Sequence, residues 1–215
     1  MNVPAIAQKT FEESKNSPSL IMILNLMIEV LQKLSTPEER VKVIHQEIDN
    51  FNRSVFSHPI VKEHSPCKMG CSGCCHTQVS VTDDEALVLF NKIKDGLKID
   101  VDRLAVQKTA VDDSEAYFKL SYEDRKCIFL DEKGACRVYE DRPSVCRTNA
   151  VLGTAEQCDT RGGLKPVRLV KTQQADMVIY AAFLHSKSNG SLSRMIAEKL
   201  ESLDDVEAKL CSDNS

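Results

Sequence analysis

The sequence lacks tryptophan, and aromatic residues make up only 5% of its 215 residues. Stacking platforms for nucleic-acid bases need exposed aromatic side chains, so this scarcity disfavours that class of protein. A basic excess is also missing, because 28 Lys and Arg residues stand against 32 Asp and Glu residues, for a net charge of -4. Broad binding to a phosphate backbone is therefore disfavoured. We expect no nucleic-acid partner.

Long apolar runs are missing as well. The stretch 20–31 contains Asn25 and Glu29, and at about 12 residues it is shorter than the ~20 needed to cross a bilayer. The first 19 residues show no basic start followed by an apolar run, so no secretory signal is expected. We therefore expect a cytoplasmic protein with reduced thiols and no membrane partner, whose partner is another protein or none.

The overall composition is that of an ordinary globular protein, with 42% hydrophobic and 28% charged residues. The length suggests one domain with a helical extension. We predict a mainly α fold with a small β-hairpin and a cysteine-rich, loop-rich metal-binding centre. The expected segments are an N-terminal helical extension packed on the core (1–56), a cysteine-cluster metal-binding region (57–160) and C-terminal helices (161–215).

Helix signals cover most of the chain outside the cysteines. Leu20–Leu34 is apolar nearly all round, which predicts a helix buried on every side. Thr36-Pro37-Glu38-Glu39 is a good helix start, and Thr82-Asp83-Asp84-Glu85 is a capping box that opens a second helix. Further helices are expected over about 102–118, 172–186 and 192–209.

Strand and turn signals are short. Residues 78–81 alternate like a strand, and residues 57–66 read as a loop. We expect a hairpin with strands at 127–130 and 135–139 around the turn 131–134, and a short helix opened by Pro143. Gly162-Gly163 indicates a loop, and residues 167–170 suggest a further short strand.

Nine cysteines are the unusual feature of this chain, and their distribution is uneven. Eight lie between residues 67 and 158, and four of these stand in Cys67-x3-Cys71-x2-Cys74-Cys75. Gly70 and Gly73 directly precede two of them, and glycine permits the tight turns that converging thiolates require. Clustered cysteines in a cytosolic chain are typical of metal ligands, since buried structural thiols rarely crowd in this way.

The expected hairpin would add two more thiols. In a hairpin with an even-length loop, paired residues have numbers with an odd sum, which places Cys127 and Cys136 on the same face as diagonal neighbours. Cys146 follows, flanked by Arg142 and Arg147. These two guanidiniums would offset the negative charge of a thiolate site and donate hydrogen bonds to its sulfurs.

Taken in order, these motifs resemble a known family. Cys67-x3-Cys71-x2-Cys74-Cys75, then Cys127-Ile-Phe-Leu, then Cys136-x-Val-Tyr-x2-Arg142-Pro143-x2-Cys146-Arg147 is similar to the YkgJ-type cysteine-cluster family of zinc- or iron-chelating proteins. The more distant flagellin lysine N-methylases look similar in the cysteine cluster and are thought to hold an iron–sulfur cluster. The resemblance implies a metal centre. It leaves open whether the protein is a binding protein or an iron–sulfur-dependent protein-modifying enzyme.

The candidate ligands exceed one four-ligand site, so the metal and the ligand set stay open. They are Cys67, Cys71, Cys74, Cys75, Cys127, Cys136, Cys146 and Cys158. Adjacent Cys74 and Cys75 are not expected to bind one small ion together. All-thiolate donors suit both zinc and iron–sulfur clusters, and the resemblance to the methylases favours iron–sulfur.

Two other chemistries share parts of this pattern. Cys67-x3-Cys71-x2-Cys74 has the spacing of the radical S-adenosylmethionine motif, but Gly73 replaces the usual aromatic residue and no strand–helix alternation follows. A cysteine nucleophile would need a histidine base, for which His58, His64 and His76 are the neighbours in sequence. Histidine is also a metal ligand, so His76 is a further candidate.

Overall fold

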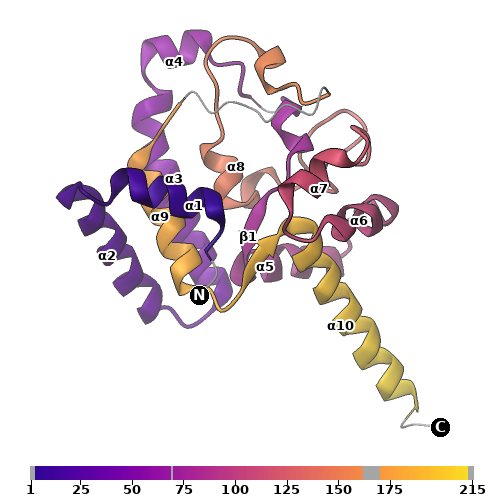
Figure 1. Cartoon of the computed structure of the whole chain (residues 1–215). Helices are drawn as coiled ribbons and strands as arrows, with labels where there is room; N and C mark the ends of the chain where they lie inside the picture. The colour runs from indigo at the N-terminus through magenta and orange to yellow at the C-terminus, as the bar shows by residue number, and fades with distance from the viewer. Residues whose placement is uncertain (1–2, 69, 162–169, 213–215) are drawn as a thin grey trace.

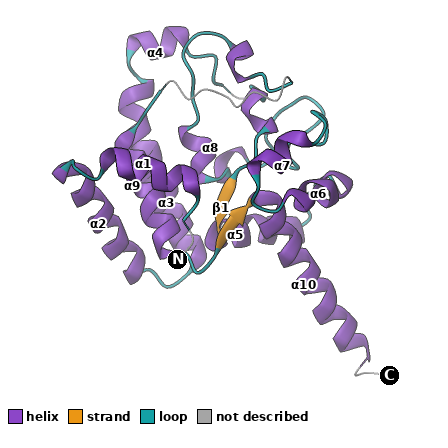
Figure 2. Cartoon of the chain, in the orientation of Figure 1, coloured by secondary structure: helices purple, strands orange, loops and turns teal. Residues whose placement is uncertain are grey.

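The computed structural model describes residues 3–68, 70–161 and 170–212, and its course is shown in Figure 1. Helices dominate the described residues, and the strands are few and short (Figure 2), so the predicted mainly α fold is confirmed. The α-helices are α1 (Ala5–Ser14), α2 (Pro18–Lys33), α3 (Pro37–Phe56), α4 (Pro59–His64), α5 (Asp83–Lys94), α6 (Val101–Gln107), α7 (Ser114–Lys119), α8 (Ser144–Thr148), α9 (Gln173–His185) and α10 (Leu192–Ser212).

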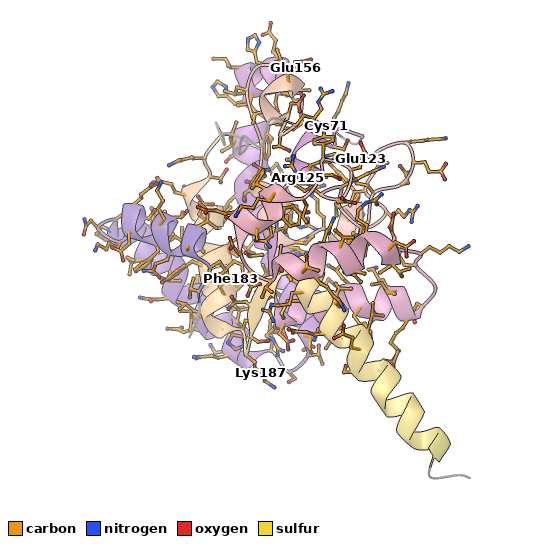
Figure 3. The ribbon with its side chains drawn as sticks, turned by 45° about the vertical axis from the view of Figure 1, so that its right-hand side comes forward. Cys71, Glu123, Arg125, Glu156, Phe183 and Lys187 are labelled. Carbon is orange, nitrogen blue, oxygen red and sulfur yellow. The ribbon has the colours of Figure 1, made fainter. Side chains whose placement is uncertain are left out.

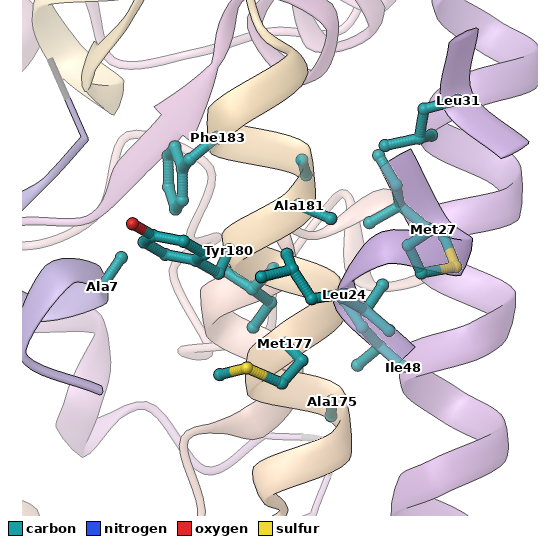
Figure 4. Close-up of a cluster of buried hydrophobic side chains, with 14 of the residues drawn as sticks. Ala7, Leu24, Met27, Leu31, Ile48, Ala175, Met177, Tyr180, Ala181 and Phe183 are labelled. Carbon is teal, nitrogen blue, oxygen red and sulfur yellow. The ribbon is translucent and has the colours of Figure 1, made fainter. Parts of the chain in front are cut away.

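One hydrophobic core forms around helix α9. Figure 4 shows side chains from α1, α2 and α3 converging on this helix. Helix α9 is buried along nearly its whole length, from Ala175 to Phe183. The predicted helix start at Thr36 is confirmed, because Thr36 and Glu39 form a complete capping box at the beginning of α3. Packing against α9 therefore fixes the N-terminal helices to a helix from much later in the chain.

Helix α2 differs from the prediction that it is buried on every side. Leu20, Leu24, Met27 and Leu31 form a buried stripe, at the spacing of one helix face. The opposite face is open, with Met22 66% exposed and Leu26 58% exposed. A helix at the edge of a small bundle has neighbours on one side only, so apolar character all round does not ensure burial all round.

A second core joins the centre of the chain to its C-terminal helix. Helices α5 and α6 and the first turns of α10 pack together, and Val81, Leu89, Ile128 and Ile196 are almost fully buried. The capping box predicted at Thr82 and Glu85 is present at the start of α5. Both cores therefore combine residues from distant parts of the chain, and the three-segment division stays a prediction.

The small antiparallel sheet pairs strand β1 (Ser80–Thr82) with strand β2 (Asn189–Ser191). Val81 pairs with Gly190, more than a hundred positions later. The expected strands at 127–130 and 135–139 were wrong as regular strands, since they meet at a single bridge between Leu130 and Cys136. That bridge has an even residue sum, so the parity argument for Cys127 and Cys136 does not hold. The turn between them is confirmed, because Asp131 accepts hydrogen bonds from the Lys133 and Ala135 amides at 2.8 Å.

Two further local predictions need correction. The expected loop 57–66 contains helix α4, because Pro59 occupies the first helical position, where its missing N–H costs nothing. The helix expected over 102–118 breaks at Val111, whose φ of 49° is incompatible with a right-handed helix. Asp113 then caps α7 by accepting the Glu115 and Ala116 amides. The predicted loop at Gly162-Gly163 and most of the predicted strand 167–170 lie outside the described residues.

Among the described residues, none of the helices combines the length and the apolar character needed to cross a membrane.

Candidate metal centre

The first cysteines lie in a tight loop that follows helix α4. Gly70 has a φ of 87°, the left-handed region that glycine adopts freely. The Cys71 amide donates to the Lys68 carbonyl at 2.9 Å, and the Cys75 amide donates to the Ser72 carbonyl at 2.9 Å. The short 3₁₀ helix η1 (Gly73–His76) then carries Cys74 and Cys75. The glycine-containing loop thus turns twice and gathers the first thiols, as the sequence predicts.

The segment around Cys127 and Cys136 lies against this loop. The Cys127 amide donates to the Cys75 carbonyl at 2.8 Å, which joins the two cysteines through their backbones. At the turn, Gly134 has a φ of 77°, and an added Cβ would stand 3.1 Å from the Ser72 hydroxyl. The turn is therefore packed directly on the residues that separate Cys71 from Cys74.

The segment around Cys158 closes the centre from another side. Gly73 faces Cys158 so closely that a Cβ at position 73 would stand 2.7 Å from the Cys158 Cβ. The 3₁₀ helix η4 (Ala155–Cys158) therefore contacts η1 directly. On the same side, the Val151 amide donates to the Cys67 sulfur at 3.4 Å. Cys158, the last of the eight candidate ligands, therefore lies beside the first cysteine loop.

Electrostatic coupling shows that the thiols share one neighbourhood, and Cys74 is at its centre. Burial raises the pKa of Cys127 to about 12 and that of Cys158 to about 11. Burial also raises the pKa values of Cys71, Cys136 and Cys146. In each of these five cysteines, a negative charge on Cys74 raises the pKa further. Sulfur atoms from every cysteine-bearing stretch between Cys71 and Cys158 therefore lie close enough to Cys74 to interact with its charge.

Cys74 is the thiol that ionises most readily. A hydrogen bond with the Cys75 side chain is the main reason that its pKa is lowered to about 7, and Asn149 and the Arg142 charge act in the same direction. The same hydrogen bond raises the pKa of Cys75. The guanidinium of Arg142 stacks on Tyr139 at 4.0 Å and also lowers the pKa of Cys136. Arg142 is thus placed to offset thiolate charge, as its position in the sequence suggests.

Helix α8, which carries Cys146, is held by a buried polar network that the sequence did not reveal. Arg147 donates to Asp49 Oδ2 at 2.7 Å, and its Nη2 lies 3.1 Å from His45 Nδ1. It also donates to the carbonyls of Arg142 and Glu140. At the other end of α8, Glu85 accepts the Ser144 amide at 2.7 Å. Arg147 therefore binds helix α3, and its expected hydrogen bonds to sulfur stay a prediction.

Arg125 is a second residue that the sequence analysis missed. Its side chain is 2% exposed and donates to the Thr160 carbonyl at 2.7 Å and to the His76 carbonyl at 3.4 Å. Its guanidinium also lies over the rings of Phe118 and Tyr122, at 5.0 and 5.5 Å. Figure 3 shows Arg125 in the part of the molecule that also contains Cys71. Arg125 therefore connects His76, which follows Cys75, with Thr160, which lies two residues after Cys158.

The histidines are placed differently from one another. His76 is buried and stacks on Tyr122 with ring centroids 4.0 Å apart, and its Nδ1 lies 3.2 Å from the Ser72 carbonyl. Burial lowers the pKa of His76, which favours the neutral ring. His58 and His64 are exposed on and beside α4. The geometry thus favours a packing role for His76 over the role of a catalytic base.

The donor set fits zinc or iron in its chemistry. The eight cysteines from Cys67 to Cys158 are free thiols, and they come from five stretches of the chain. Among the described residues, however, no group of three or more His, Cys, Asp or Glu side chains is already arranged so that it could hold a metal ion. The fit therefore rests on the convergence and the thiol chemistry of these residues rather than on a preformed coordination geometry.

A comparison with protein families bears directly on this cluster. Residues 66–161 match the family model CxxCxxCC, described as "Putative zinc- or iron-chelating domain". This stretch, less than half of the chain, is similar to that domain. The match includes all eight candidate ligands together with Arg125, Arg142 and Arg147, and it confirms the resemblance to a zinc- or iron-chelating family. No curated protein and no solved structure matches the chain.

The contact between Gly73 and Cys158, within the stretch that matches the family model, gives a prediction. Gly73→Ala should lower the free energy of unfolding by about 1–3 kcal/mol, the usual cost of overpacking, because the new Cβ would stand 2.7 Å from the Cys158 Cβ. Urea denaturation measures this cost. The destabilisation caused by Gly73→Ala should stay the same in a protein that also carries Cys158→Ala, which keeps the Cβ. It should be smaller in a protein that also carries Cys158→Gly, which removes the Cβ. Equal costs in both backgrounds would contradict the contact.

The buried carboxylate of Glu85 gives a prediction about acid. Burial alone would raise its pKa, but the neighbouring His45, whose Nε2 lies 3.5 Å away, and hydrogen bonds from Ser144 and Thr82 lower it from 4.5 to about 2. Glu85 is therefore harder to protonate in the folded protein than in the unfolded chain. Its ionised carboxylate stabilises the fold fully above pH 4.5, and this stabilisation is lost as the pH falls towards 2. The loss is on the order of 3 kcal/mol at most, at 1.36 kcal/mol for each pKa unit.

Urea denaturation of metal-free protein between pH 5 and pH 2.5 measures the effect without a contribution from ligand protonation. Glu85→Gln should flatten the pH dependence of stability. Glu39→Gln should leave it nearly unchanged, because Glu39 occupies the same position in an exposed capping box. An equally steep acid loss in Glu85→Gln and in the unmodified protein would contradict the assignment.

Proposed function

We propose that the stretch 66–161, which matches the family model, holds an iron–sulfur cluster through its cysteine thiolates. The observation that carries this proposal is the packing of the cysteine-bearing segments on one another. The Cys127 amide donates to the Cys75 carbonyl, and Gly73 packs against Cys158. The charge of Cys74 also raises the pKa values of five other cysteines. Iron–sulfur clusters are held by cysteine thiolates, usually four. The eight free cysteines between Cys67 and Cys158 exceed that number.

The chain's own residues have distinct roles in this proposal. The inner candidates come from four different stretches, and negative charges within this group raise the pKa values of its members: Cys74, Cys127, Cys136 and Cys146. Cys67, Cys71 and Cys158 form a second group on the side of Gly73. Cys75 donates its thiol proton towards Cys74, and Arg142 offsets the negative charge. A bound cluster would supply electron transfer or anchor the fold.

Anaerobic purification followed by analysis of iron, zinc and acid-labile sulfide tests the proposal. We expect a brown protein that absorbs near 400 nm and contains iron and sulfide in similar amounts. Colourless protein with stoichiometric zinc and no sulfide would replace the cluster by a zinc–thiolate site. Protein that contains neither metal after anaerobic reconstitution would overturn metal binding itself.

We further propose that the protein works in the cytoplasm, where thiols remain reduced, with a protein partner or none and no nucleic-acid partner. The supporting observation is that the eight described cysteines of the cluster are all free. Calorimetry with S-adenosylmethionine on the loaded protein separates the two classes of function. Binding would favour an enzyme resembling the lysine methylases, whereas no binding favours a metal-binding or redox-linked role.

A further inference from the structure

Helix α8 brings Cys146 into the cluster, but it cannot fix its own position. It contains only five residues, Ser144–Thr148, and the preceding Pro143 provides no side-chain cap. A helix this short is unstable without tertiary contacts, because nucleation costs more than one turn returns. The position of the Cys146 sulfur is therefore decided by whatever holds the two ends of α8.

Glu85 holds the first end. Its Oε1 accepts the Ser144 amide at 2.7 Å and the Ser144 hydroxyl at 2.6 Å. Its Oε2 accepts the Thr82 amide at 3.0 Å and the Thr82 hydroxyl at 3.1 Å. One carboxylate thus caps two helices, α5 in its own segment and α8 from a distance. Because Glu85 is 3% exposed and both oxygens are engaged, its position is tightly defined.

Helix α3 holds the second end. His45, Asp49 and Asn52 lie along one face of this helix and bind Arg147, with the Asn52 amide donating to the Arg147 carbonyl at 3.0 Å. His45 also links the two ends, since its Nε2 lies 3.5 Å from Glu85 Oε1. Cys146 stands between Ser144 and Arg147. Both Ser144 and Arg147 are therefore fixed to a network that contains no cysteine.

We propose that Glu85 is a positioning residue of the metal centre, which fixes α8 so that the Cys146 thiol meets the other thiols. This inference rests on the proposed function. Metal ligands must be held within a fraction of an ångström, and the groups that orient them commonly change metal affinity by 10- to 100-fold when altered. Glu85 acts on α8 through Ser144 and, by way of His45, through Arg147, and its charge also acts on the Cys146 thiol. Its effect should therefore fall on Cys146 and not on Cys158.

Two measurements on Glu85→Gln test the proposal. In anaerobic titrations with cobalt(II) alone, the variant should bind about 10- to 100-fold more weakly, with an altered thiolate-to-cobalt absorption band. In metal-free protein, mass spectrometry after iodoacetamide treatment should show faster alkylation of Cys146 with an unchanged rate at Cys158. Glu39→Gln is the matched control and should leave both readouts unchanged, because Glu39 bonds only within its own exposed helix start.

Ser144→Ala is a milder variant that keeps the backbone bond to Glu85 and loses the hydroxyl bond. It should shift both readouts in the same direction but by less. If Glu85→Gln accelerates alkylation of every cysteine together and Ser144→Ala changes nothing, Glu85 supports the fold only and the proposal is overturned. Unchanged cobalt affinity and alkylation in both variants would also overturn it. The iron, zinc and sulfide analysis decides the proposed function separately, and if that function fails, the alkylation comparison still decides whether Glu85 positions Cys146.

Discussion

Serine in place of Cys74 is expected to remove most of the bound metal and to lower the melting temperature of the loaded protein by about 8–16 °C. A metal held at 1,000 times its dissociation constant stabilises a protein by about 4.1 kcal/mol. For a chain of this length, each kcal/mol corresponds to about 2–4 °C. Cys74 is chosen because its charge influences five other thiols, so its loss affects the centre of the cluster.

Differential scanning calorimetry with metal analysis on the same samples measures this effect. Cys71→Ser should act in the same direction, because Cys71 lies in the same loop and interacts with Cys74. Cys211→Ser is the control, since residue 211 lies outside the matched stretch 66–161. After removal of the metal, the variants and the unmodified protein should melt within a few degrees of one another. Equal melting temperatures in the loaded state would show that Cys74 contributes no binding free energy.

Alanine in place of Arg125 is expected to lower the free energy of unfolding by about 3–5 kcal/mol, or about 10 °C in melting temperature. The substitution leaves the buried Thr160 carbonyl without the donor that lies 2.7 Å away. It also removes a cation held over two aromatic rings, each contact worth about 0.5–2 kcal/mol. Arg125→Lys should fall between, because an ammonium keeps the charge but not the forked geometry.

Arg137→Ala provides the matched control for Arg125. Arg137 also donates to a backbone carbonyl, that of Lys98 at 2.7 Å, but it does so at an exposed site. Its loss should therefore cost less than about 1 kcal/mol. Urea denaturation of the three variants gives the comparison. Similar small losses at positions 125 and 137 would mean that the buried guanidinium does not hold the two cysteine segments together.

Features that depend on local chemistry were predictable from the sequence. The capping boxes at Thr36 and Thr82 are complete within four residues, so the starts of α3 and α5 follow from the sequence alone. The turn around Asp131 and the short helix after Pro143 follow for the same reason. The proximity of the cysteine-bearing segments was also predictable, because clustered cysteines preceded by glycines are typical of a metal site.

Features that depend on distant partners were not predictable. Ser80–Thr82 pairs with Asn189–Ser191, and nothing in either tripeptide names the other. Arg125 stands in a run of charged residues that resembles a solvated loop, yet it is buried. The rings of Phe118 and Tyr122 lie nearby in sequence, but the carbonyls that accept its hydrogen bonds come from other segments. His45 and Asp49 lie beside the apolar stripe of α3, and their role depends on their contacts with Arg147 of α8. Each of these cases requires tertiary contacts that a periodicity does not encode.

The pairing of β1 with β2 also bears on what would survive if this chain were shortened. A fragment that ended at Arg161 would keep every cysteine of the cluster, but it would leave Val81 without its backbone partner and remove Ile196 from beside Leu89. The stretch that matches the family model, residues 66–161, is thus shorter than the part of the chain that packs as one unit. A graft of the cysteine stretch into another protein would therefore carry the candidate ligands without strand β2 and helix α10, which pack against their segment.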